Sequence, residues 1–171
     1  METRSFRRVT PADVSTVRDI TRAAYAKWVA VIGREPKPMT ANYEQAVAEH
    51  VIDLCEQDGR PIALIELIPK PSHLLIENIA VLPDHHGKGI GGLLLGRAET
   101  FARSLGVNEL RLYTNAKFAT NIAFYAQRGF EEFRHEPHPG GGEVVHMKKP
   151  VERAGREYHP KRDTRRGGVV S

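Results

Sequence analysis

The chain has 171 residues, of which 40% are hydrophobic and 27% are charged, and its formal net charge is +4. This length and composition are typical of one soluble globular domain with a real hydrophobic core. Cys55 is the only cysteine, which excludes an intramolecular disulfide. The sequence has no apolar run of about 18 residues and no signal-peptide pattern, so we expect a cytoplasmic protein without a membrane partner.

The positive charge is concentrated near the C-terminus. Residues 151–171 hold six Lys or Arg and three Asp or Glu. We therefore expect residues 151–171 to form a basic, flexible tail and residues 1–150 to form the folded domain. No nucleic-acid-binding motif accompanies this charge, so a nucleic acid is not an expected partner.

The N-terminal third predicts a short strand followed by two helices. Residues 5–9 form the strand, and a Thr-Pro-Ala-Asp start with a helical apolar stripe predicts a helix over residues 10–33. Its aromatic residues are expected to pack in the core. A loop with two prolines over residues 34–39 leads to a second helix, capped by Thr40 and ending near residue 50.

An antiparallel meander of three strands is expected next, with a turn at Asp58-Gly59 between the first two. A strand after the following helix implies a right-handed crossover and a parallel pair of strands. The expected ranges are 51–56, 61–68 and 74–82 for the meander, about 92–104 for a helix, 109–114 for a strand, 120–128 for a short helix, and 130–135 and 143–148 for a last hairpin.

A glycine-rich loop between the third meander strand and the next helix is the most informative stretch. It contains Gly87, Gly89, Gly91 and Gly92, with Lys88 among them. Bare backbone N–H groups at a helix N-terminus bind anions, so the loop predicts a phosphate or pyrophosphate site. A tight connection without a ligand is the simpler alternative.

A dinucleotide-binding fingerprint is a second alternative, because Gly87, Gly89 and Gly92 fit the pattern G-x-G-x-x-G. That fingerprint normally follows the first strand of a βαβ unit and precedes a strand that ends in an acidic residue. Here the loop follows an antiparallel meander, and Glu109 lies at the beginning of the next strand. The surrounding elements therefore disfavour a dinucleotide.

Two motifs resemble the GNAT family, the Gcn5-related N-acetyltransferases. The segment from His86 to Gly91, His-Gly-Lys-Gly-Ile-Gly, is similar to the family's pyrophosphate loop, Gln/Arg-x-x-Gly-x-Gly/Ala, with a histidine in the first place. The segment from Asn121 to Phe130 resembles the family's Asn … Tyr … Gly-Phe segment, although Phe118 stands where the asparagine is usual. The resemblance covers about residues 4–149.

The resemblance implies an α/β (α+β) fold, with a mixed, mostly antiparallel, seven-stranded sheet flanked by about four helices. It also implies acetyl-CoA as the acetyl donor. The residues that would bind this cofactor are Ala80, Val81, His86, Gly87, Lys88, Gly89, Ile90, Gly91, Gly92, Asn121 and Phe124.

Tyr125 and Glu77 are the candidate catalytic residues. By resemblance, the Tyr125 hydroxyl would protonate the departing thiolate, and the Val81 N–H would face the thioester carbonyl. Strand alternation places Glu77 on the same side as Ile79 and Val81, where a carboxylate accepts the amine proton, unless a bulge changes the parity. Glu66 and His73 are weaker candidates for this base. No cluster has metal-ligand spacing, since the adjacent His85 and His86 side chains diverge.

The expected function is N-acetyltransfer from acetyl-CoA directly to a primary amine of a small molecule or peptide. The alternative is a GNAT-like regulatory module that binds CoA without catalysis. The amine substrate would be bound by the first helix, the loop over residues 36–43 and the last hairpin. A homodimer is compatible with these expectations.

Overall fold

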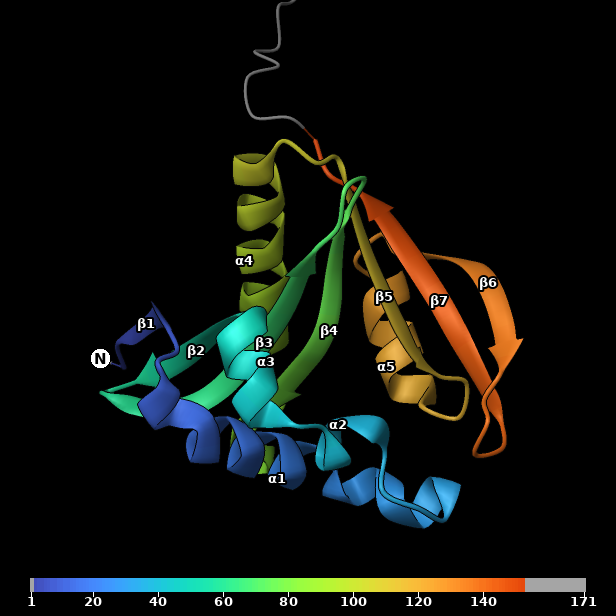
Figure 1. Ribbon diagram of the computed structural model, residues 1–171, viewed down its shortest axis with the longest axis horizontal. Helices are drawn as coiled ribbons and strands as arrows, with labels where there is room; N and C mark the ends of the chain where they lie inside the picture. Colours follow the sequence, from blue (N-terminus) through green and yellow to red (C-terminus); the bar gives the residue numbers. More distant parts are fainter. Residues whose placement is uncertain (1, 153–171) are drawn as a thin grey trace, which may run out of the picture.

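The computed structural model describes residues 2–152 of the chain (Figure 1). The predicted tail therefore lies almost entirely outside the described residues. The elements in chain order are β1 (Arg4–Arg8), a 3-10 turn (Pro11–Asp13), α1 (Val14–Ile32), α2 (Lys37–Thr40), α3 (Tyr43–Glu49), β2 (Val51–Gln57), β3 (Arg60–Pro69), β4 (Leu74–Val81), a second 3-10 turn (Pro83–His85), α4 (Ile90–Leu105), β5 (Glu109–Asn115), α5 (Ala119–Ala126), β6 (Glu131–Pro137) and β7 (Glu143–Pro150).

The seven strands form one sheet in the order β1-β2-β3-β4-β5-β7-β6. All neighbours are antiparallel except β4 and β5, which pair in parallel only between Leu74–Ile76 and Leu110–Leu112. Beyond these three pairs the two strands diverge, as Figure 1 shows between the labels β4 and β5. The predicted mixed, mostly antiparallel sheet is confirmed, and the divergence opens a split at its centre.

Helices cover both faces of the sheet (Figure 1). On one face α1 and α3 bury a core that includes Val17, Ile20, Leu54 and Leu64. On the other face α4 packs on the strands through residues such as Leu94, and side chains of α5 pack against the same cluster. The sheet is thus a layer between two hydrophobic cores, as expected from a chain with helices on each side of the meander.

The start of the first helix is held by a carboxylate. Asp13 is buried and accepts a hydrogen bond from the Thr10 N–H at 2.7 Å. Its two carboxylate oxygens also accept hydrogen bonds from the two terminal nitrogens of Arg7, each at 2.8 Å. The Arg7 contact holds the pKa of the Asp13 carboxyl far below its usual range. The predicted Thr-Pro-Ala-Asp start is therefore present, with the aspartate providing the main contact.

Two details of the helical predictions are wrong. Residues 37–40 form the short helix α2 rather than a loop, which makes five α-helices among residues 2–152. Pro38 is in the first turn of that helix, where a missing N–H costs no hydrogen bond. The next helix is capped by Asn42, whose side chain accepts from the Gln45 N–H at 3.1 Å, and not by Thr40.

A bulge in β4 changes which face Glu77 occupies. Leu67 pairs with Ile76 and Glu66 pairs with Asn78, so Glu77 is an extra residue on β4. Glu77 and Asn78 consequently lie on the same face, away from Ile79, which packs toward the α4 core. The expectation that Glu77 shares a face with Ile79 and Val81 is therefore wrong, because the bulge inverts the alternation along the strand.

None of the helices formed by residues 2–152 combines the length and the apolar character that a membrane span requires.

Candidate active site

Two cavities open beside the split in the sheet. The first, which we call the loop cleft, has a volume of about 510 Å³ and lies between α1, the glycine-rich loop and α5. It is lined by Ala24, Tyr25, Lys27, Trp28, Ile79, Val81, His85, His86, Gly87, Gly89, Ile90, Gly91, Thr120, Asn121, Phe124, Tyr125 and Arg128. The loop cleft is large and open at the N-terminus of α4, where a long ligand with a phosphate would fit.

The glycines of the loop have specific roles. Gly89 is the N-cap of α4 and has a φ of 77°, a conformation that favours glycine. A Cβ atom at Gly91 would lie 2.7 Å from Cζ of Phe124, so this position admits no side chain unless the ring moves. The loop therefore brings the first-turn N–H groups of α4 close to the wall formed by α5.

The charged groups that line the loop cleft are basic. Lys27 and Arg128 lie on its two walls, and no carboxylate is present among its lining residues. The Arg128 guanidinium lies 3.7 Å above the centre of the Phe124 ring and donates to the Phe124 carbonyl at 3.1 Å. These cations and the N-terminus of α4 produce a positive potential that suits a polyanion.

Two adjacent histidines, His85 and His86, line the loop cleft and have different surroundings. Nε2 of His86 lies 2.7 Å from the Val81 carbonyl, so the ring connects the loop back to the end of β4. Nδ1 of His85 is buried and has no hydrogen-bond partner among residues 2–152. A buried nitrogen without a partner fits a site in which an oxygen of a ligand supplies the missing contact.

Tyr125 lies on the wall of the loop cleft that α5 provides. Its ring packs edge-on against Phe124 and Phe130, with centroids 5.3 and 5.6 Å away. Burial raises the pKa of Tyr125 to about 12, so the phenol is protonated at neutral pH. A protonated hydroxyl on this wall can act as a hydrogen-bond donor or as an acid.

The second cavity, which we call the carboxylate cavity, has a volume of about 110 Å³ and lies on the other side of Tyr25, which lines both. It is lined by Tyr25, Ile32, Arg34, Pro36, Lys37, Pro38, Ala41, Tyr43, Glu66, Glu77, Asn78, Tyr113, Thr114, Asn115, Phe118, His138 and Val144. The end of α1, residues 36–43 and the last hairpin contribute to it, together with β3, β4 and β5.

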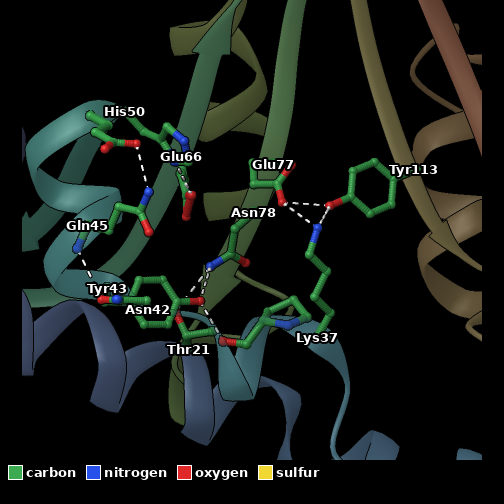
Figure 2. A network of polar contacts seen from close by, with 12 residues as sticks. Thr21, Lys37, Asn42, Tyr43, Gln45, His50, Glu66, Glu77, Asn78 and Tyr113 are labelled. Atoms are coloured by element: carbon green, nitrogen blue, oxygen red, sulfur yellow. Dashed lines mark hydrogen bonds and ion pairs between the residues drawn. The ribbon is translucent and has the colours of Figure 1, made fainter. Parts of the chain in front are cut away.

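A network of three polar side chains forms one wall of the carboxylate cavity (Figure 2). The Tyr113 hydroxyl donates to Oε1 of Glu77 at 2.6 Å, and Nζ of Lys37 contacts the same oxygen at 3.2 Å and the Tyr113 hydroxyl at 2.8 Å. Glu77 is largely shielded, with 18% of its side chain exposed, whereas Lys37 is 63% exposed. An ammonium group on a flexible chain thus already contacts this carboxylate.

The floor of the carboxylate cavity contains Glu66 and Asn78, which are each 3% exposed. Nδ1 of His50 lies 2.9 Å from Oε2 of Glu66. Burial raises the pKa of the Glu66 carboxyl, while the His50 contact acts in the opposite direction. At the rim, Arg34 donates to the carbonyls of Gly140 and Gly141, which connects the end of α1 to the β6–β7 loop.

Most of the predicted site residues lie around the loop cleft. Ala80, Lys88 and Gly92 are the predicted cofactor residues that do not line it, and Ala80 instead packs in the α1 core. Glu77 lies in the carboxylate cavity, as does Glu66, whereas His73 precedes β4 at the opposite end of that strand.

The residues that sequence reasoning missed come from α1, α2 and β5. Tyr25 and Trp28 were expected only in the core, yet both line the loop cleft, while Lys37 and Tyr113 reach Glu77. Arg128 also lines the loop cleft, and its place inside the second motif, just before Gly129 and Phe130, was the one sequence signal for it.

A positive cleft and a carboxylate-lined cavity thus adjoin at a split in the sheet, an arrangement that suits an anionic ligand beside a smaller one. The model of the acetyltransferase (GNAT) family matches residues 16–130, and the chain belongs to this family, whose members use acetyl-CoA as the acetyl donor. The predicted family and fold are thus confirmed.

Relatives and solved structures agree with this assignment. An uncharacterised N-acetyltransferase of Methanocaldococcus jannaschii is 31% identical over 86 residues, which cover 46% of this chain and 38% of the relative. Streptothricin acetyltransferase of Streptomyces lavendulae is 44% identical over 57 residues, which cover 33% of this chain and 30% of the relative. The chain thus spans well under two thirds of these relatives.

Two solved structures share the fold over nearly their whole length. The PaiA N-acetyltransferase of Thermoplasma acidophilum, solved with coenzyme A, has a TM-score of 0.70 at 20% identity and covers 86% of this chain and 99% of its own. The ribosomal-protein-S18-alanine N-acetyltransferase of Escherichia coli has a TM-score of 0.68 at 22% identity and covers 92% of this chain and 99% of its own.

Proposed function

We propose that this protein is an acetyl-CoA-dependent N-acetyltransferase that acetylates a primary amine by direct attack. The observation that carries this proposal is the pair of cavities of contrasting character that meet at Tyr25. The loop cleft suits the phosphates of a CoA ester, and the carboxylate cavity suits an amine. The alternative of a CoA-binding module without catalysis gains no support from the geometry.

The loop cleft has the groups that a CoA ester requires. The N–H groups at the start of α4 would receive the pyrophosphate, with Lys27 and Arg128 on the two walls adding positive charge. The divergence of β4 from β5 after Ile76 leaves room for the pantetheine arm beside the backbone of Val81. When bound, acetyl-CoA supplies an activated acetyl thioester.

Glu77 and Tyr125 take the two proton transfers in this mechanism. Glu77 accepts a proton from the acceptor ammonium or its water, in the position where it now contacts Lys37. Tyr125, whose pKa burial raises to about 12, is protonated at neutral pH and would donate its phenolic proton to the departing thiolate. The neutral amine attacks the acetyl carbon directly, so no nucleophilic side chain is required.

Acetyl-CoA is expected to stabilise the protein against unfolding. At a concentration of about 100 times Kd, binding to the native state alone adds about 2.7 kcal/mol to the free energy of unfolding. A thermal-shift titration with acetyl-CoA measures this effect, and thiol release across a panel of amines then measures turnover. An unchanged melting temperature would contradict both cofactor binding and catalysis, whereas binding without turnover on any amine would favour the regulatory module.

Replacement of Gly91 by alanine is expected to weaken acetyl-CoA binding several-fold. The new Cβ would lie 2.7 Å from the Phe124 ring, which Arg128 covers on one face, so the ring must move at the wall of the cleft. Overpacking of this kind costs about 1 kcal/mol or more in the free energy of unfolding. Acetyl-CoA titrations and denaturant unfolding measure the two effects.

Gly96→Ala is the matched control on the same helix. Apart from its chain neighbours and the helix's own backbone, no atom lies within 4 Å of a Cβ at Gly96, so this variant should bind acetyl-CoA normally. It should also gain about 0.5–1 kcal/mol from helix propensity. If the Gly91 and Gly96 variants behave alike, the close contact with Phe124 has no part in binding.

A further inference from the structure

The side-chain amide of Asn78 is oriented by contacts with Thr21 and Tyr43. Its Nδ2 donates to Oγ1 of Thr21 at 3.1 Å and to the Tyr43 hydroxyl at 3.4 Å. The Tyr43 hydroxyl gives its own hydrogen to the Pro38 carbonyl at 2.6 Å and must therefore accept from Asn78. In Figure 2 the nitrogen of Asn78 faces Tyr43, and its oxygen points the other way.

This orientation leaves Oδ1 of Asn78 without a donor. The atom is buried and has no hydrogen-bond partner among residues 2–152. A buried acceptor without a partner costs roughly 1–3 kcal/mol, so such atoms are rare unless a ligand or water completes them. Because Asn78 lines the carboxylate cavity, a molecule in that cavity can supply the missing donor.

Glu66 adds a carboxylate to the same cavity floor. It is the cross-strand partner of Asn78 in the β3–β4 pairing and lines the same cavity. Oε2 faces His50, whereas Oε1 has no hydrogen-bond partner among the residues that the structure describes. The floor of the cavity thus offers an amide oxygen and a carboxylate oxygen, a pair that matches a protonated amine.

A second amine position exists nearby, at Glu77. The Lys37 ammonium contacts Glu77 and Tyr113, which shows that a primary alkylammonium fits there. Lys37 is largely exposed and can move into solvent when an acceptor takes its place. The bulge puts Glu77 and Asn78 on one face, and both line the carboxylate cavity, so the two amine positions share one cavity.

We propose that the acceptor is a small molecule with two amino groups on a short alkyl chain, a diamine or a diamino acid. One amino group is acetylated beside Glu77, and the other is held as an ammonium by Asn78 and Glu66. This inference rests on the proposed acetyltransferase function and adds the class of acceptor. In the reaction the ammonium first loses one proton through Glu77 to solvent, and the neutral amine then forms the C–N bond as the thioester C–S bond breaks. The thiolate receives a proton from Tyr125, and the second proton lost from the nitrogen on amide formation restores the Tyr125 phenol.

The test compares pairs of amines that differ only in the second amino group. Thiol release from acetyl-CoA is measured with putrescine against n-butylamine and with cadaverine against n-pentylamine, and lysine and ornithine are added as diamino acids. We expect kcat/KM to be at least about tenfold higher for a diamine than for its monoamine, the effect of one charge-assisted hydrogen bond.

Two variants locate this preference. Glu66→Gln keeps the shape of the side chain, and Asn78→Leu removes the orphan oxygen; each should lower kcat/KM for the diamine about tenfold and change the monoamine much less. Asp53→Asn is the matched control, because Asp53 is equally buried on neighbouring β2 but contacts Arg8 and Arg97 outside the cavity. Asp53→Asn should leave the ratio of kcat/KM for the diamine to kcat/KM for the monoamine unchanged.

Three results would overturn the proposal. They are equal kcat/KM for diamines and monoamines, a preference that persists in Glu66→Gln, and turnover of other amines while no diamine or diamino acid is acetylated. The last of these leaves the acetyltransferase function intact, whereas absence of acetyl-CoA binding refutes that function itself. Failure of Asn78→Leu to fold does not affect the test, since Glu66→Gln gives the same readout.

Discussion

Tyr125→Phe is expected to lower the rate of thiol release by about 10² or more while acetyl-CoA affinity changes little. The variant keeps the ring that packs between Phe124 and Phe130 and removes only the hydroxyl. Without a proton donor, the negative charge that develops on the departing sulfur is not neutralised, which raises the barrier of the chemical step. Steady-state kinetics with the best available amine and an acetyl-CoA titration separate the two quantities.

Tyr25→Phe provides a comparison within the same cleft. Its hydroxyl donates to the Ile79 carbonyl at 3.3 Å and is therefore engaged with the backbone. We expect a smaller loss of turnover from this variant than from Tyr125→Phe. Unchanged turnover in Tyr125→Phe would remove Tyr125 as the acid, and equal losses in both variants would indicate a general effect on the cleft.

Glu77→Gln is expected to lower turnover at neutral pH by about 10² to 10⁴, because the amine loses its proton acceptor. The amide preserves the size of the side chain and can still contact Tyr113. The deficit should shrink as pH rises, since more of the acceptor amine is then neutral without assistance. A pH series of kcat/KM for wild type and variant measures this convergence.

The stability of Glu77→Gln provides its control. The lost contact is with Lys37, which is 63% exposed, and exposed ion pairs contribute at most about 1 kcal/mol. Denaturant unfolding should therefore show a nearly native protein with low activity. Wild-type turnover at neutral pH would show that another group, such as Glu66, accepts the proton.

The sequence predicted the elements around the loop cleft because their signals are local. Four glycines between a β-branched strand and a leucine-rich helix determine a strand-loop-helix unit, and the order of the strands determined the mixed sheet. The acidic start of the first helix was likewise visible in Thr10, Pro11 and Asp13. These patterns depend on neighbouring residues alone.

The carboxylate cavity was harder to predict because it depends on pairing between distant segments. The bulge at Glu77 follows from the register of β4 against β3, and nothing in the residues of β4 indicates it. The contacts of Lys37 with Glu77 and Tyr113 join residues 40 and 76 positions apart. Thr40 and Asn42 are both good caps, and only the three-dimensional path of the chain selects Asn42.

The short pairing of β4 with β5 has a mechanical consequence. Three register pairs are the parallel contact that joins strands β1–β4 to strands β5–β7, so the sheet consists of two parts, or leaves, that are paired over a short length. A ligand inserted between the leaves would hydrogen-bond to the strand edges and act as a brace. We therefore expect a bound cofactor to hold the two leaves at one spacing, and with it the distance between Glu77 on β4 and Tyr125 on α5.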